Sequence, residues 1–175
     1  MGKAVLRAAL WLLLPVALLA QNKDGLYGTP KAELYTGYSF VKIEGSDMHG
    51  WNVSVAGNVN PNLGIVADIA GQYNSEKSTS GATAISSNLT FTSIMAGPRV
   101  TDRTLKNFTP FAHALVGMTR VNADITQQLG SVTSSLSNDV TGFSTALGGG
   151  LDINVSKGLS VRLFQIEYLL IRADG

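Results

Sequence analysis

The sequence predicts an all-β protein: an antiparallel up-and-down transmembrane β-barrel with eight strands expected and seven present in this chain. Three observations predict this class. Seven long segments alternate in polarity with a period of two, the connections between them alternate in length, and an apolar leader stands at the N-terminus. Barrel strands that cross a bilayer alternate between lipid-facing and lumen-facing side chains. With 175 residues, the chain has room for one domain.

The seven alternating segments are longer than the five or six residues usual for strands in soluble proteins. A tilted strand that crosses a bilayer needs about 9 to 11 residues, and every segment is at least that long. Each is bounded by Gly, Asn, Asp, Ser or Pro, which favour turns. The segments are Ala32–Glu44, Gly50–Asn60, Leu63–Asn74, Asn88–Thr101, Thr109–Asp124, Thr141–Val155 and Leu159–Arg172.

The connections between these segments segregate by parity. The second, fourth and sixth are short, the third and fifth are long and polar, and the first is of modest length. Transmembrane barrels have short turns on the periplasmic side and longer loops on the outside, whereas a soluble sandwich has no reason to sort its loops in this way. In chain order the connections are 45–49, 61–62, 75–87, 102–108, 125–140 and 156–158.

The N-terminus has the composition of a secretory signal peptide. Lys3 and Arg7 provide positive charge, and residues 8–20 contain none. This stretch matches the apolar region of a signal peptide and is shorter than the roughly 20 apolar residues of a transmembrane helix. We expect cleavage after Ala20, with an uncleaved anchor as the alternative. The predicted division is a signal peptide at 1–20, a short periplasmic segment at 21–31 and the barrel at 32–175.

Seven strands leave the chain on the outer side of the membrane. Barrels of this kind have an even number of strands, and an open edge would expose unpaired backbone groups to lipid at a cost of several kcal/mol each. We therefore expect an eighth strand to return after Gly175 and to end in an aromatic residue.

Alternation also assigns side chains to the lumen. A cation on the lipid face at mid-bilayer costs about 2–4 kcal/mol, so ionisable groups within strands are expected to point inward. Side chains just fill the interior of an eight-stranded barrel. We therefore predict a lumen closed by ion pairs and hydrogen bonds, with a narrow polar channel as the alternative. The predicted lumen polar network consists of Asp68, Arg99, His113, Asp152, Gln165 and Glu167.

The sequence predicts no catalytic, cofactor or metal site. There is no cysteine, which excludes disulfides and thiolate chemistry. The two histidines, His49 and His113, have no serine two residues further along the chain. The glycines at 148–150 are not followed by the Lys-Ser or Lys-Thr of a phosphate loop, which favours relief of crowding where the strand curves. Thirteen basic against twelve acidic residues give no surface for nucleic acid.

Five stretches carry a family resemblance: 32–40, 50–73, 95–100, 109–121 and 146–172. They resemble the OmpA-like, porin-family group of Gram-negative outer-membrane β-barrels. The resemblance implies an eight-stranded monomeric barrel in the cell outer membrane, surrounded by outer-membrane lipid. It also implies partners during biogenesis, namely periplasmic chaperones and the barrel-assembly machinery. It implies no particular activity, and the chain lacks the group's closing strand and any peptidoglycan-binding domain.

The function predicted from these observations is a structural or surface-interaction role without enzymatic activity. The segments 75–87 and 125–140 would be displayed outside the membrane. Two alternatives remain open at this point. One is a narrow porin for passive diffusion of small solutes, and the other is a soluble periplasmic ligand-binding barrel of the lipocalin type.

Overall fold

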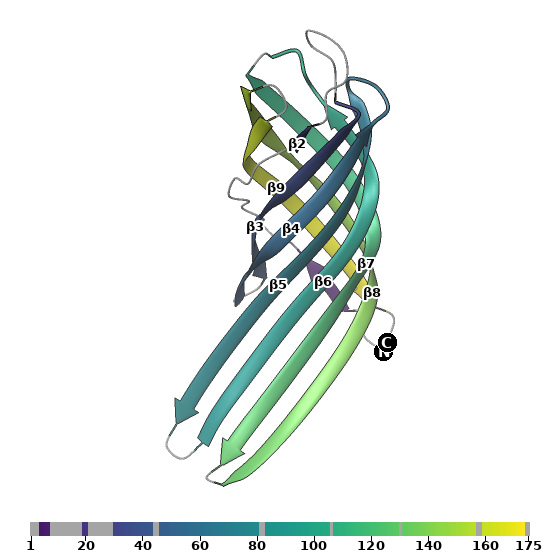
Figure 1. Cartoon of the computed structure of the whole chain (residues 1–175). Coiled ribbons are helices and arrows are strands. Elements are labelled where there is room, and N and C mark those ends of the chain that lie inside the picture. The colour runs from purple at the N-terminus through teal and green to yellow at the C-terminus, as the bar shows by residue number, and fades with distance from the viewer. Residues whose placement is uncertain are drawn as a thin grey trace.

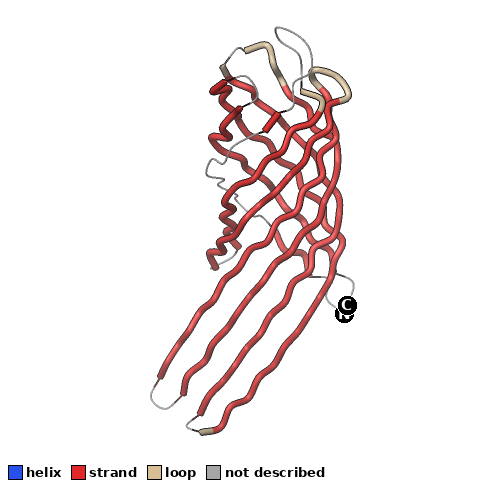
Figure 2. The backbone as a smooth tube through the Cα atoms, viewed as in Figure 1, coloured by secondary structure: helices blue, strands red, loops and turns tan. Residues whose placement is uncertain are grey.

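The protein is all-β. The computed structural model describes residues 4–7, 19–20, 30–43, 46–80, 83–105, 107–129, 131–156 and 159–173. Figure 2 shows these residues as strands and connecting turns, and no helix among them could cross a membrane. The strands are β1 (Ala4–Arg7), β2 (Leu19–Ala20), β3 (Ala32–Ile43), β4 (Ser46–Asn58), β5 (Leu63–Ser80), β6 (Thr83–Thr101), β7 (Phe108–Leu129), β8 (Val132–Ser156) and β9 (Leu159–Ala173).

All strands belong to one antiparallel sheet that curves around an interior (Figure 1). Strands β3 to β9 follow one another in space in chain order, so the sheet is an up-and-down meander. Because antiparallel neighbours need only tight turns, the chain has no crossover connection between these strands. The predicted fold class is confirmed, and each of the seven predicted segments forms one of these long strands.

The two short strands lie at the edges of the seven-stranded sheet. β1 pairs with the end of β9, where Ala4 is opposite Ala173, and β2 pairs with the start of β3, where Ala20 is opposite Glu33. Both belong to the region predicted as a signal peptide. Most of that region, and of the predicted periplasmic segment 21–31, lies outside the described residues. The signal peptide, its cleavage and the closing eighth strand stay predictions.

The prediction of two long polar loops is wrong. β5 and β6 remain paired as far as Ser80 and Thr83, and β7 and β8 as far as Leu129 and Val132. The first connection is also shorter than predicted, because β4 already begins at Ser46. Thr, Ile and Val are frequent in these stretches and favour strands. A strand outside the membrane does not need an apolar outward face. The alternation that was used to recognise membrane strands therefore does not continue into 75–87 and 125–140.

The paired hairpins extend well beyond the rest of the sheet (Figure 1). Pairing of β4 with β5 ends at Tyr73, and pairing of β9 with β8 begins at Phe143. Past these residues only β5 to β8 continue. We call this part the protruding sheet and define it as residues 74–80, 83–89, 121–129 and 132–140. The end of the barrel that carries it is the hairpin end, and the opposite end, where β4 is followed by β5, β6 by β7 and β8 by β9, is the turn end.

The barrel wall has an apolar outer face and a mixed interior. Large apolar side chains are exposed on the outside, among them Ile65, Ile94, Val116 and Leu147, as alternation predicts. The interior differs between its two ends. Polar groups gather toward the turn end, whereas the part nearer the hairpin end is filled by an apolar cluster that includes Val41, Met48, Phe91, Leu169 and Ile171.

Candidate functional site

The lumen near the turn end is crossed by charged side chains of alternating sign. They come from β3, β6, β8 and β9, and all are buried. Arg99 Nη1 lies 3.3 Å from Glu33 Oε2, and Arg99 Nη2 lies 3.2 Å from Asp152 Oδ2. Arg162 donates to the same carboxylate, with Nε 2.7 Å from Asp152 Oδ1 and Nη2 3.1 Å from Oδ2. Two guanidinium groups and two carboxylates thus tie opposite walls together.

Two aromatic rings enclose the guanidinium groups. Arg99 Cζ lies 4.8 Å from the ring centroid of Tyr35 and 4.4 Å from that of Phe111. For Arg162 the corresponding distances are 4.0 and 4.2 Å. A cation over an aromatic face gains about 2 kcal/mol or more where water is excluded. The Tyr35 hydroxyl also accepts a hydrogen bond from Arg99 Nη1 at 2.5 Å, so the cations are held by rings as well as by carboxylates.

The network continues along β9 toward β7. Arg162 Nη1 donates to Gln165 Oε1 at 2.5 Å, and the Gln165 amide donates to Glu167. His113 Nε2 lies 2.7 Å from Glu167 Oε1, which is ion-pair distance, although the ring nitrogen is not aligned for a hydrogen bond. A Cβ at Gly148 would lie 2.5 Å from Glu167 Cγ and 2.9 Å from His113 Nε2. The glycine therefore gives these two side chains their space.

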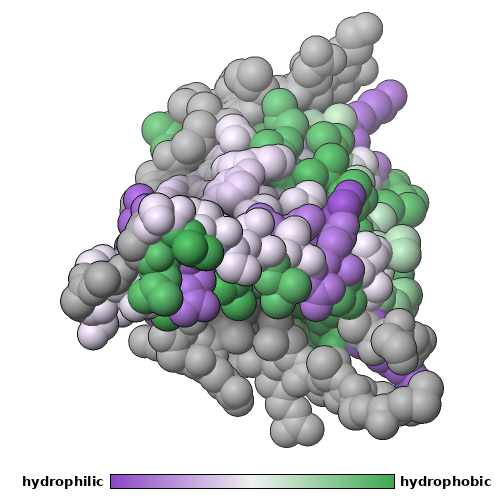
Figure 3. Space-filling model, turned by 90° about the horizontal axis from the view of Figure 1, so that it is seen from below, coloured by the Kyte–Doolittle hydropathy of each residue, from purple (hydrophilic) through white to green (hydrophobic). Residues whose placement is uncertain are grey.

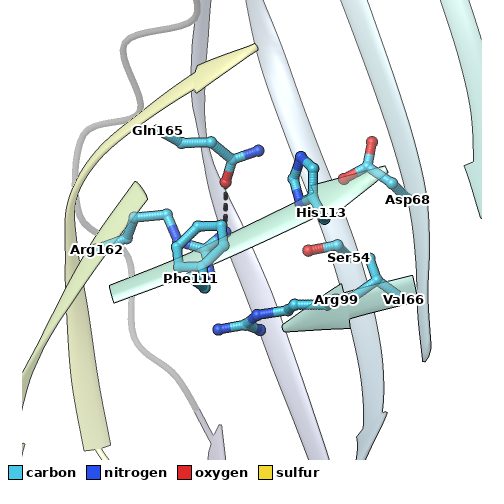
Figure 4. A pocket seen from close by; sticks show the side chains of 8 residues that line it. All are labelled: Ser54, Val66, Asp68, Arg99, Phe111, His113, Arg162 and Gln165. Carbon is cyan, nitrogen blue, oxygen red and sulfur yellow. Dashed lines mark hydrogen bonds between the residues drawn. The ribbon is translucent and has the colours of Figure 1, made fainter. Parts of the chain in front are cut away.

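All six residues of the predicted lumen network are buried in the interior. The structure joins five of them through Arg162: Arg99, Asp152, Gln165, Glu167 and His113. Asp68 stands apart from this chain of contacts, since its carboxylate accepts a hydrogen bond from Asn52 Nδ2 at 2.7 Å. It still faces the same small space as His113 and Arg162 (Figure 4).

Sequence reasoning missed three members of the network, Glu33, Tyr35 and Arg162. Glu33 and Tyr35 alternate with apolar residues in β3, a signal that was available. Arg162 could not be found by alternation, because simple counting places it on the same face as Phe164. The register between β8 and β9 shifts at this point, so that Leu151 is opposite Phe164 while Asp152 is opposite Arg162. This bulge makes Leu163 an extra residue and turns Arg162 inward.

The turns at the turn end are connected to the charged network. Arg103 forms an ion pair with Glu33 and donates from Nε to the Pro61 carbonyl at 3.1 Å. Asn62 Nδ2 donates to the Thr101 carbonyl at 3.0 Å. In the exposed turn itself, the backbone N–H of Thr104 donates to Asp102 at 2.9 Å and lowers the pKa of that carboxyl. The adjacent turns are thereby linked to each other and to the charged network.

A cavity of about 10 Å³ lies between these side chains. This volume corresponds to roughly one water molecule. Figure 4 shows Phe111 and Arg162 on one side of the space and His113 and Asp68 on the other. No group of three His, Cys, Asp or Glu residues suited to a metal ion occurs within the described part of the chain. The site is therefore a tightly packed cluster of paired charges in the barrel interior.

An apolar outer face, an interior that holds the charged groups and an antiparallel meander define the class: this is a transmembrane β-barrel. Residues 6–174 match the family model described as "Outer membrane protein beta-barrel domain". The chain belongs to this family, and it is a protein of the outer membrane. This localisation excludes the soluble, lipocalin-like alternative. The OmpA-like, porin-family resemblance agrees with the family at the level of the barrel.

The solved structures that resemble the chain include two of one protein. One is the crystal structure of Ail, the attachment invasion locus protein of Yersinia pestis, in complex with the heparin analogue sucrose octasulfate. It is 15% identical, with a TM-score of 0.47 over 99% of this chain and 100% of that chain. The other is a crystal structure of Ail from Yersinia pestis. It is 15% identical, with a TM-score of 0.46 over 97% of this chain and 99% of that chain. A search of curated proteins finds no match.

Proposed function

We propose that this protein is a non-enzymatic, non-conducting barrel that anchors the protruding sheet at the cell surface for structural or binding purposes. The observation that carries the proposal is the closed lumen. Ion pairs connect β3, β6, β8 and β9 across the interior, and the cavity left between them has a volume of about 10 Å³. A hydrated solute has no path of its own size through this layer.

The protruding sheet supports the second half of the proposal. It lies at the end where the chain extends farthest beyond the barrel wall, and the longer excursions of outer-membrane barrels are extracellular, whereas the chain returns directly on the periplasmic side. The sheet would then face the outside of the cell. It consists of four paired strands, so binding groups would be presented on a regular sheet rather than on loops. We infer that the protein acts as a monomer in outer-membrane lipid and relies on periplasmic chaperones and the barrel-assembly machinery during biogenesis.

Single-channel recording in planar bilayers tests the closed lumen. We expect no steady openings from the intact protein. Arg99→Ala combined with Arg162→Ala removes both guanidinium groups from the lumen, and we expect this variant to show cation-selective openings because Glu33 and Asp152 remain. Arg120→Ala is the matched control, since Arg120 pairs with Asp139 at the exposed surface of β7 and β8. Steady openings from the unaltered protein would support the narrow porin instead.

Exposure at the cell surface has its own test. The chain has no cysteine, so Thr126→Cys places a single thiol in the protruding sheet. A membrane-impermeant thiol reagent added to intact cells should label it. Labelling only after the outer membrane is opened would contradict the proposed orientation.

A further inference from the structure

The polarity of the strands reverses where they leave the barrel. Within the barrel, β7 turns Val116 and Met118 outward and Leu115 inward. Continuing the alternation along β7 brings Val121, Ile125 and Leu129 to the inward side and Asn122, Asp124 and Thr126 to the outward side. The reversal suits a sheet that leaves lipid, since its outward face then meets water. It also gives the protruding sheet an inward face on which apolar side chains of β7 and β8 are interspersed with Gln127, Ser134 and Asn138.

The neighbouring strand repeats this pattern. Cross-strand partners share a face of the sheet, and Ile125 is opposite Leu136 while Leu129 is opposite Val132. The exposed fractions of these side chains are high, with 58% for Leu129, 67% for Val132 and 68% for Leu136. Apolar groups of this kind are visible at the surface when the molecule is seen from the hairpin end (Figure 3).

The inward face is continuous with the interior of the barrel. Phe91 is opposite Val121, and Val121 is opposite Val140, so one row of side chains crosses three strands. Phe91 belongs to the buried apolar cluster, and Val121 packs against it. A partner lying on the inward face would therefore extend a hydrophobic core that already exists.

Among the residues that the structure describes, a backbone edge of β8 without a strand partner borders this face. Residues 132–142 of β8 pair with β7 on one side, while pairing with β9 starts only at Phe143. Exposed edges are usually protected by Lys, Pro or other charges. The edge of β8 carries one charged residue, Asp139, which is engaged by Arg120. The opposite edge, 74–80 of β5, contains Glu76 and Lys77 and is protected in the usual way.

These features point to a polypeptide as the occupant. An acyl chain could cover the apolar side chains, but it could not pair with the N–H and C=O groups of the edge. A second copy in the same membrane presents its β8 in the same direction, so the two edges cannot form the more stable antiparallel pairing. An extended segment from another protein can satisfy both the edge and the face.

We propose that the β8 edge of the protruding sheet binds an extended polypeptide segment whose side chains alternate between apolar and polar. The added strand pairs with 132–142 and turns its apolar side chains inward, beside Val132, Leu136 and Val140. Its polar side chains continue the outward face. This inference rests on the proposed function, because it requires the protruding sheet to be exposed to partners.

A peptide-binding assay on the full chain in detergent tests the proposal. The probe is a synthetic peptide of alternating Leu and Thr between flanking lysines, and the comparison peptide has the same composition with its leucines contiguous. Binding is followed by a fluorophore on Thr126→Cys. We expect the alternating peptide to bind at least about tenfold more tightly, because only this peptide turns all its leucines to one face. Equal affinity for the two peptides would overturn the proposal.

Two adjacent serines provide a matched pair of variants. Ser134 lies on the inward side and Ser135 on the outward side of the same edge. Ser134→Lys should weaken binding by about tenfold, because an inward charge blocks strand addition without removing any apolar residue. Ser135→Lys adds the same charge and should leave the affinity within about twofold. Equal losses in both variants would contradict the assigned geometry.

The thiol-labelling experiment separates this inference from the proposed function. If Thr126→Cys is labelled on intact cells and the alternating peptide binds selectively, both stand. If the thiol is labelled but the peptides do not differ, the peptide-binding inference fails alone. If the thiol is not reached from outside, the proposed function fails, and the inference fails with it.

Discussion

Arg162 donates two hydrogen bonds to Asp152, one from Nε at 2.7 Å and one from Nη2 at 3.1 Å. Both groups are buried, and Arg162 also touches Gln165 and two aromatic rings. Arg162→Ala should therefore lower the free energy of unfolding by about 3 kcal/mol, because it leaves a buried carboxylate with fewer partners. Urea unfolding of the protein in lipid vesicles measures the change.

The control for this variant is Arg120→Ala. Arg120 pairs with Asp139, but both side chains are exposed. Exposed ion pairs contribute at most about 1 kcal/mol, so the loss should be well below that of Arg162→Ala. Equal losses would mean that the buried pair has no special weight in the stability of the barrel.

Because of the bulge in β9, we expect one residue of this strand to be removable without loss of the fold. Leu163 is the extra residue between the two registers of β8 and β9. Removing it restores simple alternation and leaves Arg162, Gln165 and Glu167 inward. Ile166 is also an outward apolar residue, but its deletion makes Gln165 and Glu167 adjacent. All residues on one side of the deletion then change to the opposite face of the sheet. We expect the Leu163 deletion to fold and to keep its heat-modifiable migration in detergent gels, and the Ile166 deletion to lose it.

Gly148 and Gly57 make a second matched pair. A Cβ at Gly148 would collide with Glu167 and with backbone, whereas at Gly57 nothing lies within 4 Å. Gly148→Ala should cost about 1–3 kcal/mol of stability, the usual range for overpacking. Gly57→Ala should be close to neutral. If the two alanine variants unfold at the same urea concentration, the close packing around Gly148 is not a constraint.

We expect the exposed turn that follows β6 to lower the pKa of the Asp102 carboxyl group. The Thr104 N–H bonds to Asp102, and so does the Thr104 side chain, which stabilises the ionised form. The pKa of Asp102 should lie below the usual value of about 3.9. Since the folded-state value is the lower one, the stabilisation is present above the unfolded pKa and lost as pH falls through the folded pKa. A carboxyl NMR titration measures the shift.

Thr104 itself offers the variants for that titration. Thr104→Pro removes the donor N–H and should return the pKa of Asp102 toward its usual value. Thr104→Ala keeps the N–H and should preserve most of the shift. A pKa that is unchanged by the proline substitution would show that the backbone hydrogen bond is not its cause.

Alternation in polarity was sufficient to predict the membrane strands, because lipid and lumen impose opposite requirements on adjacent residues. It also identified Arg99, Asp152 and Glu167 as inward-facing. It failed at Arg162, where an extra residue in one strand breaks the count. It failed again in 75–87 and 125–140, where the requirement imposed by lipid ends and the two faces exchange character. Which inward groups bond to each other depends on cross-strand register, which no single strand reveals.

The contacts of β9 across the interior have a consequence for the order of assembly. Arg162, Gln165 and Glu167 all come from β9, and their partners Asp152 and His113 stand on β8 and β7. Until β9 joins the sheet, Asp152 has Arg99 but not Arg162 as an ion-pair partner, and His113 lacks Glu167. The charges of the interior are therefore fully paired only after β9 has joined β8, which makes the pairing of this strand a late and stabilising step of assembly.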